Sequence, residues 1–219
     1  MDDIEWLHAD EALIVAVKPS GLLAVPGRTE PDCLAARAQT RWLDARVVHR
    51  LDQATSGLML LARGAAAQRT LSLAFAERRI AKRYVAVVEG ELVGEAGEID
   101  LPLAADWPRR PRQQVDPVHG KPSLTRWRVL ARAGGRTSVE LEPVSGRSHQ
   151  LRVHLQHLGH PICGDTLYGS GAASAPRLLL HATQMVLTHP LLGTRLAFRS
   201  LPPFQTAATV ALIDHQGPT

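Results

Sequence analysis

The chain has 219 residues, of which 45% are hydrophobic and 21% charged, a composition typical of a globular protein with a buried core. No apolar run reaches the roughly 18 residues that a membrane span needs, and the acidic start Met1–Trp6 lacks the pattern of a signal peptide. The two cysteines, Cys33 and Cys163, exclude a disulfide framework and a multi-cysteine zinc site. We therefore expect a cytoplasmic protein that does not contact membranes.

The predicted elements indicate an α+β fold with a mixed, mainly antiparallel sheet flanked by helices and loops. No glycine-rich GxGxxG motif follows the first strand, which disfavours a dinucleotide-binding order. We expect a single domain over residues 1–219, with its last dozen residues peripheral. In chain order, the predicted elements are strand 12–17, helix 32–43, strand 57–62, helix 65–77, strand 84–88, a hairpin of 125–130 and 138–141 across Gly134-Gly135, helix 148–158, and strands 178–187 and 196–198.

The basic residues are mostly arginines. Three of the 25 basic residues are lysines, and the formal net charge is +4. Arginine suits nucleic acid because its planar guanidinium binds phosphate and stacks on bases. A GC-rich genome would also replace lysine with arginine, so the composition leaves both explanations open.

The segment His49–Gly57 places a carboxylate, Asp52, on a loop that leads directly into the most apolar strand. A loop that enters a buried strand holds its side chains firmly, which suits a nucleophile or a general base. The alternative is an Asx-turn, in which Asp52 only binds nearby backbone amides.

A second segment carries arginines at the start of helix 148–158, for which Ser148 is the expected N-cap and Gly159 the residue after the C-cap. Arg147 and Arg152 lie at the positive end of this helix, where a cation is unfavourable unless an anion is bound nearby. The arrangement favours an anionic partner, either a carboxylate or a phosphate. Solvated arginines are the alternative.

The histidines of this region do not have the spacing of a zinc site. His154, His157 and His160 lack the i, i+4 pair of an HExxH helix, and Cys163 is the one further candidate ligand nearby. We expect partly buried or RNA-facing histidines and no metal.

A third segment, residues 106–122, combines prolines with Trp107 and a group of arginines. Prolines disfavour regular structure here, while arginine and tryptophan supply phosphate contacts and a stacking face. A soluble proline-rich linker is the alternative. Together with the basic residues at 78–83, however, the segment favours binding to RNA or DNA.

The combination of His49–Gly57, Ala81–Tyr84 and Gly146–Arg152 resembles the RluA family of pseudouridine synthases. The flanking segments Val17–Leu22 and Gly159–Asp165 match in the same order, so the resemblance covers nearly the whole chain. Several members carry an N-terminal S4 RNA-binding domain. The resemblance here begins within the first twenty residues, so we expect no S4 domain.

The resemblance implies that Asp52 is the catalytic aspartate, that Tyr84 packs on the target base and that Arg147 pairs with Asp52. Arg50 is similar to the arginine that fills the gap left by the flipped uridine, and Leu151 lies in the matched helix, where it walls the pocket. The further expected substrate contacts are His49, Lys82, Arg152, Arg109, Arg110 and Arg112.

The implied reaction breaks the C1′–N1 bond of uridine and forms a C1′–C5 bond, which requires a flipped base and a carboxylate but no redox partner. The segment Asp106–Pro108 resembles the short, dual-specificity members, which modify both tRNA and large-subunit rRNA. We expect the targets to be uridines in the tRNA anticodon stem-loop, in a 23S rRNA hairpin loop, or in both. We also expect a monomer without metal or organic cofactor.

Two rival functions use the same features. A base-removing glycosidase or nucleoside transferase would use the same carboxylate and flipped base but would release free uracil. A non-catalytic RNA-binding module has no need of a carboxylate in a basic groove. Whether Asp52 attacks the sugar, attacks the base or abstracts a proton is left open.

Overall fold

The computed structural model describes residues 4–204, which pack as two compact units. The first unit contains the residues up to Lys82 together with His181–Pro202, and the second contains Arg83–Leu180 together with Pro203 and Phe204. The Asp52 segment therefore belongs to the first unit and the Arg147 segment to the second. The single domain expected from the sequence stays a prediction.

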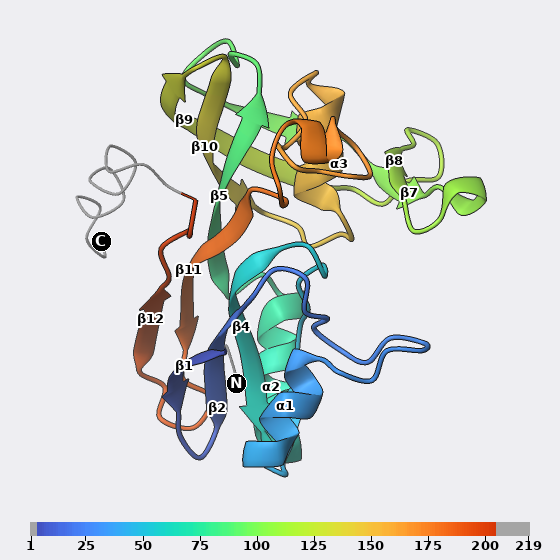
Figure 1. Cartoon of the computed structure of the whole chain (residues 1–219). Coiled ribbons are helices and arrows are strands. Elements are labelled where there is room, and N and C mark those ends of the chain that lie inside the picture. Colours follow the sequence, from blue (N-terminus) through green and yellow to red (C-terminus); the bar gives the residue numbers. More distant parts are fainter. Residues whose placement is uncertain (1–3, 205–219) are drawn as a thin grey trace. The chain divides into compact units, whose positions relative to one another are not determined.

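The first unit is built on a mixed sheet (Figure 1). Strands β1, β2, β4 and β11 lie side by side in this order, β3 pairs with β4, and β12 pairs with β11. Every pair is antiparallel except β4 and β11, which are parallel, with Ser56 opposite His181. The strands are β1 (Glu5–Ala9), β2 (Leu13–Lys18), β3 (Ala45–Val47), β4 (Ser56–Arg63), β11 (Leu180–Thr188) and β12 (Arg195–Arg199).

Strand β4 forms the centre of the hydrophobic core in this unit. All residues from Gly57 to Ala62 are buried, which confirms the strand predicted from this apolar run. Helix α2 (Gly64–Ala76) follows β4 directly and packs against β4 and β3, and α1 (Leu34–Arg41) packs against β3. Helix α1 is shorter than predicted at both ends. It starts after Cys33, whose Sγ accepts the N–H of Ala36 at 3.3 Å as the N-cap, and it ends at Arg41, before the extended residue Trp42.

Glycine is required at position 57, at the start of β4. Gly57 has a φ of +113°, and a Cβ atom there would lie 2.4 Å from the backbone oxygen of Ala182 in β11. No side chain fits in this space, so the parallel pairing of β4 and β11 depends on the glycine that follows Thr55-Ser56. Beside it, the hydroxyl of Ser56 is hydrogen-bonded to Nδ1 of the buried His181 at 2.8 Å.

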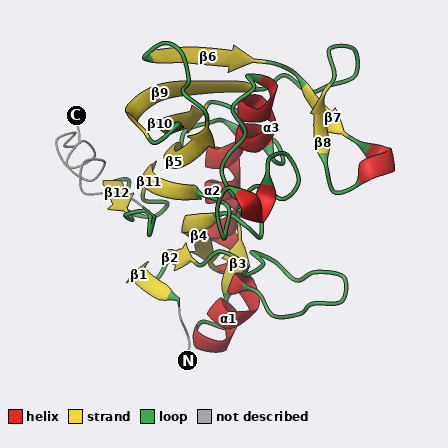
Figure 2. Ribbon diagram, turned by 45° about the horizontal axis from the view of Figure 1, so that its top comes forward, coloured by secondary structure: helices red, strands yellow, loops and turns green. Residues whose placement is uncertain are grey.

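The second unit contains an antiparallel sheet in the order β5–β10–β9–β6, of which Figure 2 shows β6, β9 and β10 side by side. Gly134 and Gly135, with φ angles of 59° and 68°, form the two-residue turn between β9 and β10, which confirms the predicted hairpin. The elements are β5 (Ala81–Glu89), β6 (Ala96–Asp100), β7 (Leu103–Ala105), 3-10 helix η1 (Trp107–Arg109), β8 (Gln113–Val115), β9 (Leu124–Ala133), β10 (Arg136–Pro143), α3 (Gln150–His157) and 3-10 helix η2 (Gly171–Ala173).

The predicted N-cap of the helix at 148–158 was wrong. Helix α3 starts at Gln150, and its N-cap is His149, a left-handed residue (φ 54°) whose side chain makes no capping bond. The carboxamide of Gln150 organises this turn instead, its Oε1 accepting the hydroxyl of Ser145 at 2.8 Å and the N–H of Arg147 at 3.0 Å. At the other end, Gly159 follows the C-cap with a φ of +83°, as predicted.

Regular structure in residues 103–115 was not predicted. Strands β7 and β8 pair antiparallel, and η1 lies between them, so the prolines do not exclude order here. Pro108 stands in the first turn of η1, where a missing N–H costs no hydrogen bond. The prediction for the last dozen residues lies outside the described residues. Within 4–204, no helix has the length and apolar character needed to cross a membrane.

Candidate active site

The loop that carries Asp52 lies between β3 and β4. Asp52 is half-buried, the preceding Leu51 is buried and Arg50 is exposed. The main-chain carbonyl of Asp52 accepts the N–H of Thr55 at 3.1 Å and closes a turn just before the strand begins. The loop therefore delivers its carboxylate from the edge of the buried core, as the sequence predicted.

A buried lysine anchors this loop. Lys18 is fully buried, and its Nζ donates to the carbonyls of Pro19 at 2.8 Å, Leu22 at 2.7 Å and Gln53 at 3.1 Å. All three ammonium protons thus have acceptors, which compensates part of the cost of burying the charge. Because Gln53 is the residue after Asp52, the lysine ties the main chain beside the carboxylate to the turn at 19–22.

Three further hydrogen bonds reinforce this anchor. The N–H of Gly21 donates to Gln53 at 2.9 Å, the side chain of Gln53 donates back to the carbonyl of Gly21 at 3.0 Å, and Ser20 Oγ donates to Ala54 at 2.7 Å. Sequence reasoning used Val17–Leu22 as a segment that matches the family and missed the role of Lys18. The available signal was a lysine at the end of a fully apolar strand, where an ammonium needs several carbonyl acceptors.

His49 and Lys82 both lie against the same aromatic ring, that of Phe75 in α2. The imidazole stacks on Phe75 with ring centroids 4.4 Å apart, and the Lys82 ammonium is 5.7 Å from the Phe75 centroid. Nε2 of His49 accepts the N–H of Leu60 at 2.9 Å. Burial and the nearby Lys82 charge lower the pKa of His49 to about 3, so the ring is neutral at physiological pH. The geometry favours a structural role for His49 over the expected substrate contact.

Lys82 has a different environment from His49. Burial lowers the pKa of its ammonium. Within residues 4–204, this ammonium makes no hydrogen bond. Lys82 precedes Tyr84 by two residues on β5, so the two side chains leave the strand on the same face. A half-buried ammonium that has no hydrogen-bond acceptor in the protein is suited to bind an anionic or carbonyl group of a substrate.

Tyr84, Arg147 and Leu151 belong to the second unit. Tyr84 is half-buried and stands opposite Leu141 of β10, while Leu151 is buried in the first turn of α3. Arg147 is exposed, with Nε donating to the carbonyl of Pro122 at a long 3.4 Å. Its main chain is held by Gln150, so the guanidinium extends from a well-defined turn.

Arg152 does not have the surroundings of a substrate-binding residue. It is buried and forms a bidentate ion pair with Asp165, with both N–O distances at 2.8 Å. Asp165 Oδ1 also accepts the N–H groups of Leu167 and Tyr168 at 2.9 and 3.1 Å. The anion that the sequence predicted near the start of α3 is thus, for this arginine, a carboxylate of the protein, and we assign Arg152 a structural role.

Leu103–Val115, which contains β7, η1 and β8, is called the basic arm from here on. Its three arginines have different partners: Arg109 pairs with the buried Asp106 at 2.7 Å, and the guanidinium of Arg110 lies 3.3 Å from the ring centroid of Trp107. Arg112 lies 5.3 Å from the ring centroid of Tyr168. Arg109 and Arg110 remain exposed, so the arm presents positive charge to solvent.

Tyr168 joins the basic arm to the turn before α3. Its hydroxyl accepts the N–H of Gln113 in β8 at 2.7 Å and is hydrogen-bonded to Nδ1 of His149 at 2.7 Å. The ring packs in a small hydrophobic cluster with Leu103 and Val153, and burial raises the pKa of the phenol, so it stays protonated. The arm and the Arg147 turn are therefore connected through one side chain that sequence reasoning did not single out.

The remaining histidines of this region have structural partners. His154 is fully buried between Thr125 Oγ1 at 2.9 Å and the carbonyl of Leu101 at 3.1 Å, and Nδ1 of His160 lies 2.9 Å from the carbonyl of Glu89. Among residues 4–204, no three His, Cys, Asp or Glu side chains gather in a group that could hold a metal ion. That the protein works without metal or cofactor stays a prediction.

Comparison with known proteins gives consistent matches. The family model described as RNA pseudouridylate synthase matches residues 12–157. The chain is 47% identical over 203 residues to the dual-specificity RNA pseudouridine synthase RluA of Escherichia coli strain K12, covering 90% of this chain and 93% of the relative. It is 43% identical over 206 residues to the protein of the same name from Haemophilus influenzae, covering 92% and 94%.

Two solved human structures share the fold. The human RNA pseudouridylate synthase domain containing 1 superimposes with a TM-score of 0.80 at 24% identity, covering 99% of this chain and 96% of that one. The human RNA pseudouridylate synthase domain containing 4 superimposes with a TM-score of 0.76 at 25% identity, covering 95% and 92%.

Proposed function

Because the chain belongs to the RNA pseudouridylate synthase family and isomerises uridine in RNA to pseudouridine, we propose that Asp52 supplies the carboxylate of this reaction. The observation that carries the proposal is the anchoring of its loop by Lys18 and the turn at 19–22. A reacting carboxylate needs a fixed main chain and a half-buried position, and Asp52 has both.

The isomerisation moves one bond of the nucleotide. The C1′–N1 bond breaks, the detached uracil turns, and a C1′–C5 bond forms while the hydrogen on C5 leaves as a proton and N1 gains one. No atoms or electrons are exchanged with another substrate. Asp52 stabilises the positive character at C1′ or accepts the proton, and the uridine reaches it by flipping out of the RNA.

The other proposed site residues hold the base and the RNA. Tyr84 packs on the uracil, Arg147 pairs with Asp52 and keeps it ionised, and Arg50 enters the space left by the flipped nucleotide. Exposure of Arg50 and Arg147 supports contacts with RNA. Leu151 contributes to the pocket wall, and the ammonium of Lys82 contacts the substrate from the same face of β5 as Tyr84.

The RNA substrates we propose are the tRNA anticodon stem-loop and a hairpin loop of 23S rRNA. The support is the 43–48% identity, over about 90% of the chain, to relatives whose name includes dual specificity. We further propose that the enzyme acts in the cytoplasm as a monomer, with one domain that contains the complete site. Incubation with unmodified tRNA and 23S rRNA fragments, followed by carbodiimide-dependent reverse-transcription stops, identifies the uridines that react.

Asp52→Asn tests the central residue, because it preserves size but removes the negative charge. With RNA tritiated at uridine C5, wild-type protein releases tritium to water, whereas Asp52→Asn releases none and still binds the RNA. Asp32→Asn, at an exposed carboxylate that pairs with Arg37, is the matched control and keeps full activity. Tritium release by Asp52→Asn at the wild-type rate would assign the reaction to another group.

The same assay separates the two rival functions. A glycosidase releases free uracil, so detection of uracil with wild-type protein would contradict the isomerase. A binding module would retain the RNA but release neither tritium nor uracil. Formation of pseudouridine without loss of mass from the RNA excludes both.

A further inference from the structure

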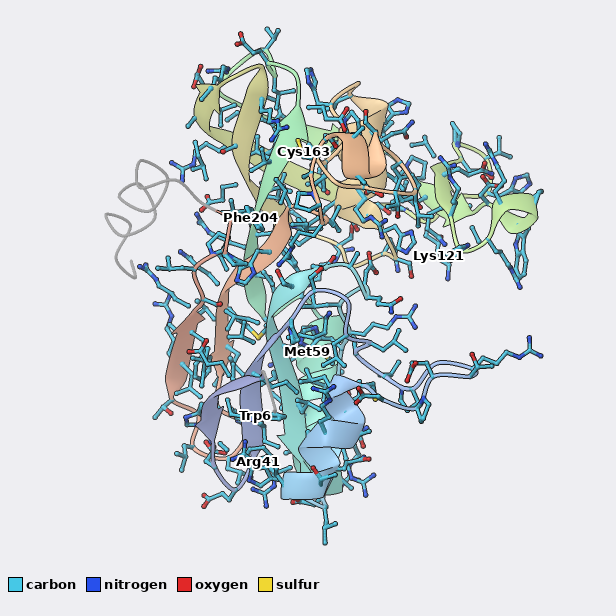
Figure 3. The ribbon with its side chains drawn as sticks, in the orientation of Figure 1. Trp6, Arg41, Met59, Lys121, Cys163 and Phe204 are labelled. Carbon is cyan, nitrogen blue, oxygen red and sulfur yellow. The ribbon has the colours of Figure 1, made fainter. Side chains whose placement is uncertain are left out.

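Trp107, at the tip of the basic arm, is the most exposed tryptophan in the protein, with 67% of its surface accessible. Trp6, Trp42 and Trp127 are half-buried. Trp6 and Trp42 pack on each other with centroids 5.0 Å apart, beside Arg41, which Figure 3 shows next to Trp6. An exposed tryptophan surrounded by polar residues is typical of a binding surface.

The main chain around Trp107 is fixed by hydrogen bonds. The N–H of Asp106 donates to the carbonyl of Arg112 at 2.9 Å, and the N–H of Arg112 donates to Arg109 at 3.0 Å. The buried carboxylate of Asp106 binds Arg109 at 2.7 Å, and at the base of the arm Tyr168 accepts the N–H of Gln113. Trp107 is therefore exposed on an ordered support, which lowers the entropy lost when a ligand binds.

One face of the indole is occupied by a cation. The guanidinium of Arg110 lies 3.3 Å from the ring centroid, which is stacking distance, so the accessible surface of Trp107 belongs to its opposite face and its edges. The supporting arginine makes this aromatic surface electropositive. A ligand that stacks here is flat and aromatic and belongs to an anionic chain, which describes a nucleobase in single-stranded RNA.

We propose that the open face of Trp107 stacks on an unpaired base of the RNA substrate, at a nucleotide other than the uridine that reacts, with Arg110 supporting the indole from behind. This inference rests on the proposed function, since it assumes a structured RNA with an unpaired loop. It assigns to the arm recognition of a base in addition to the phosphate contacts expected of its arginines.

The first test compares substitutions at Trp107 by affinity and turnover. Trp107→Leu keeps apolar bulk but removes the aromatic face, and we expect KM for an unmodified anticodon stem-loop transcript to rise on the order of 5- to 100-fold, with kcat unchanged. Trp107→Phe restores most of the affinity. Leu192→Ala, at a residue with 66% exposure in the first unit, is the matched control and leaves KM unchanged. An unchanged KM for Trp107→Leu overturns the proposal.

The second test identifies the base. Each unpaired nucleotide of the transcript is replaced in turn by an abasic one, and binding to Asp52→Asn protein with and without Trp107→Leu is measured by filter retention. We expect one position at which removing the base weakens binding to the protein that has Trp107. At this position, the Trp107→Leu protein binds the abasic and the intact RNA equally well. If the effects simply add at every position, Trp107 stacks on no base. Pseudouridine formation by wild-type protein is measured separately, so failure of the proposed function is distinguishable from failure of this inference.

Discussion

The Asp52 loop, between β3 and β4, and the basic arm both present charged side chains, but they are held in opposite ways. In the loop, the cation is inside: Lys18 is buried and binds three main-chain carbonyls, and the charge that the loop presents is a carboxylate. In the arm, the carboxylate is inside: Asp106 is buried, and the charges at the surface are the guanidinium groups of Arg109 and Arg110.

The difference corresponds to two kinds of task. A reacting group must be held in one position, which is achieved by anchoring the main chain beside it with a buried, fully hydrogen-bonded charge. A surface that recognises a flexible polyanion needs accessible cations on an ordered base. In both segments, a buried group of opposite sign holds the part that presents charge to solvent.

The largest effect on stability is expected when the buried ion pair between Arg152 and Asp165 is broken. Arg152→Leu leaves Asp165 buried and unpaired and lowers the free energy of unfolding by about 3–5 kcal/mol, measured by urea denaturation. The double replacement of Arg152 and Asp165 by leucine recovers a large part of this loss, because no uncompensated charge remains. A single variant as stable as wild type would mean that Arg152 is not tied to Asp165 in solution.

Replacing Lys18, which anchors the Asp52 loop, is expected to have a smaller effect on stability and a large effect on activity. Lys18→Met leaves the carbonyls of Pro19 and Leu22 without the ammonium donor and removes one of the two donors to the carbonyl of Gln53, which costs roughly 2–4 kcal/mol. Turnover of folded protein falls further than stability accounts for, since the main chain beside Asp52 is no longer tied down. Lys121→Met, at an exposed lysine, changes neither quantity. Full turnover by folded Lys18→Met protein would separate the anchor from the reaction.

The interior of the first unit is expected to respond to acid. Because the pKa of His49 is about 3 in the folded protein and higher when unfolded, protonation favours the unfolded chain. The neutral imidazole of His49 therefore contributes stability that is fully present above about pH 6.5 and is lost as the pH falls towards 3. The ring is partly exposed, so we expect wild type to lose about 1–2 kcal/mol more than His49→Gln between pH 7 and 4.5 in urea titrations. Equal losses in both proteins would place the acid sensitivity elsewhere.

The smallest effect on stability is expected in the arm. Replacing Arg110 and Arg112 by alanine, with Arg109 kept as the partner of the buried Asp106, leaves the unfolding midpoint nearly unchanged. The double replacement flattens the plot of log K for RNA against log salt by about 1.4, at roughly 0.7 for each phosphate contact. A control with Arg28 and Arg69, exposed arginines of the first unit, replaced by alanine keeps the wild-type slope. If the arm variant also keeps it, these arginines are solvated and make no phosphate contacts.

Sequence patterns were sufficient where local chemistry determines the structure. The apolar run in β4 and the Gly134-Gly135 hairpin have strong local signals, and the position of Asp52 at the edge of the core follows from its place before a buried strand. Strands β3, β7 and β8 were missed because each has three residues, too few to show a period. The five-residue strands β1 and β6 were missed as well.

The side chains that hold the site together were harder to predict. Lys18 binds carbonyl groups, which every residue has, so the sequence contains no complementary residue to find. Asp165 neutralises Arg152 across thirteen positions, through a turn that only the fold brings back to α3. Gln150, rather than Ser148, organises the start of α3 because a longer carboxamide reaches both Ser145 and the N–H of Arg147.

The close parallel pairing of β4 with β11 has a consequence for how the protein is made. The strand that follows the Asp52 loop meets its neighbour through Gly57 and Ala182, 125 residues apart in the chain. Contacts of such long separation form slowly, since a large loop must close first. A ribosome must therefore synthesise most of the chain before the edge of β4 beside Asp52 is complete. A nascent chain that already carries the arginines of the basic arm has not yet assembled the surroundings of the carboxylate that we propose reacts.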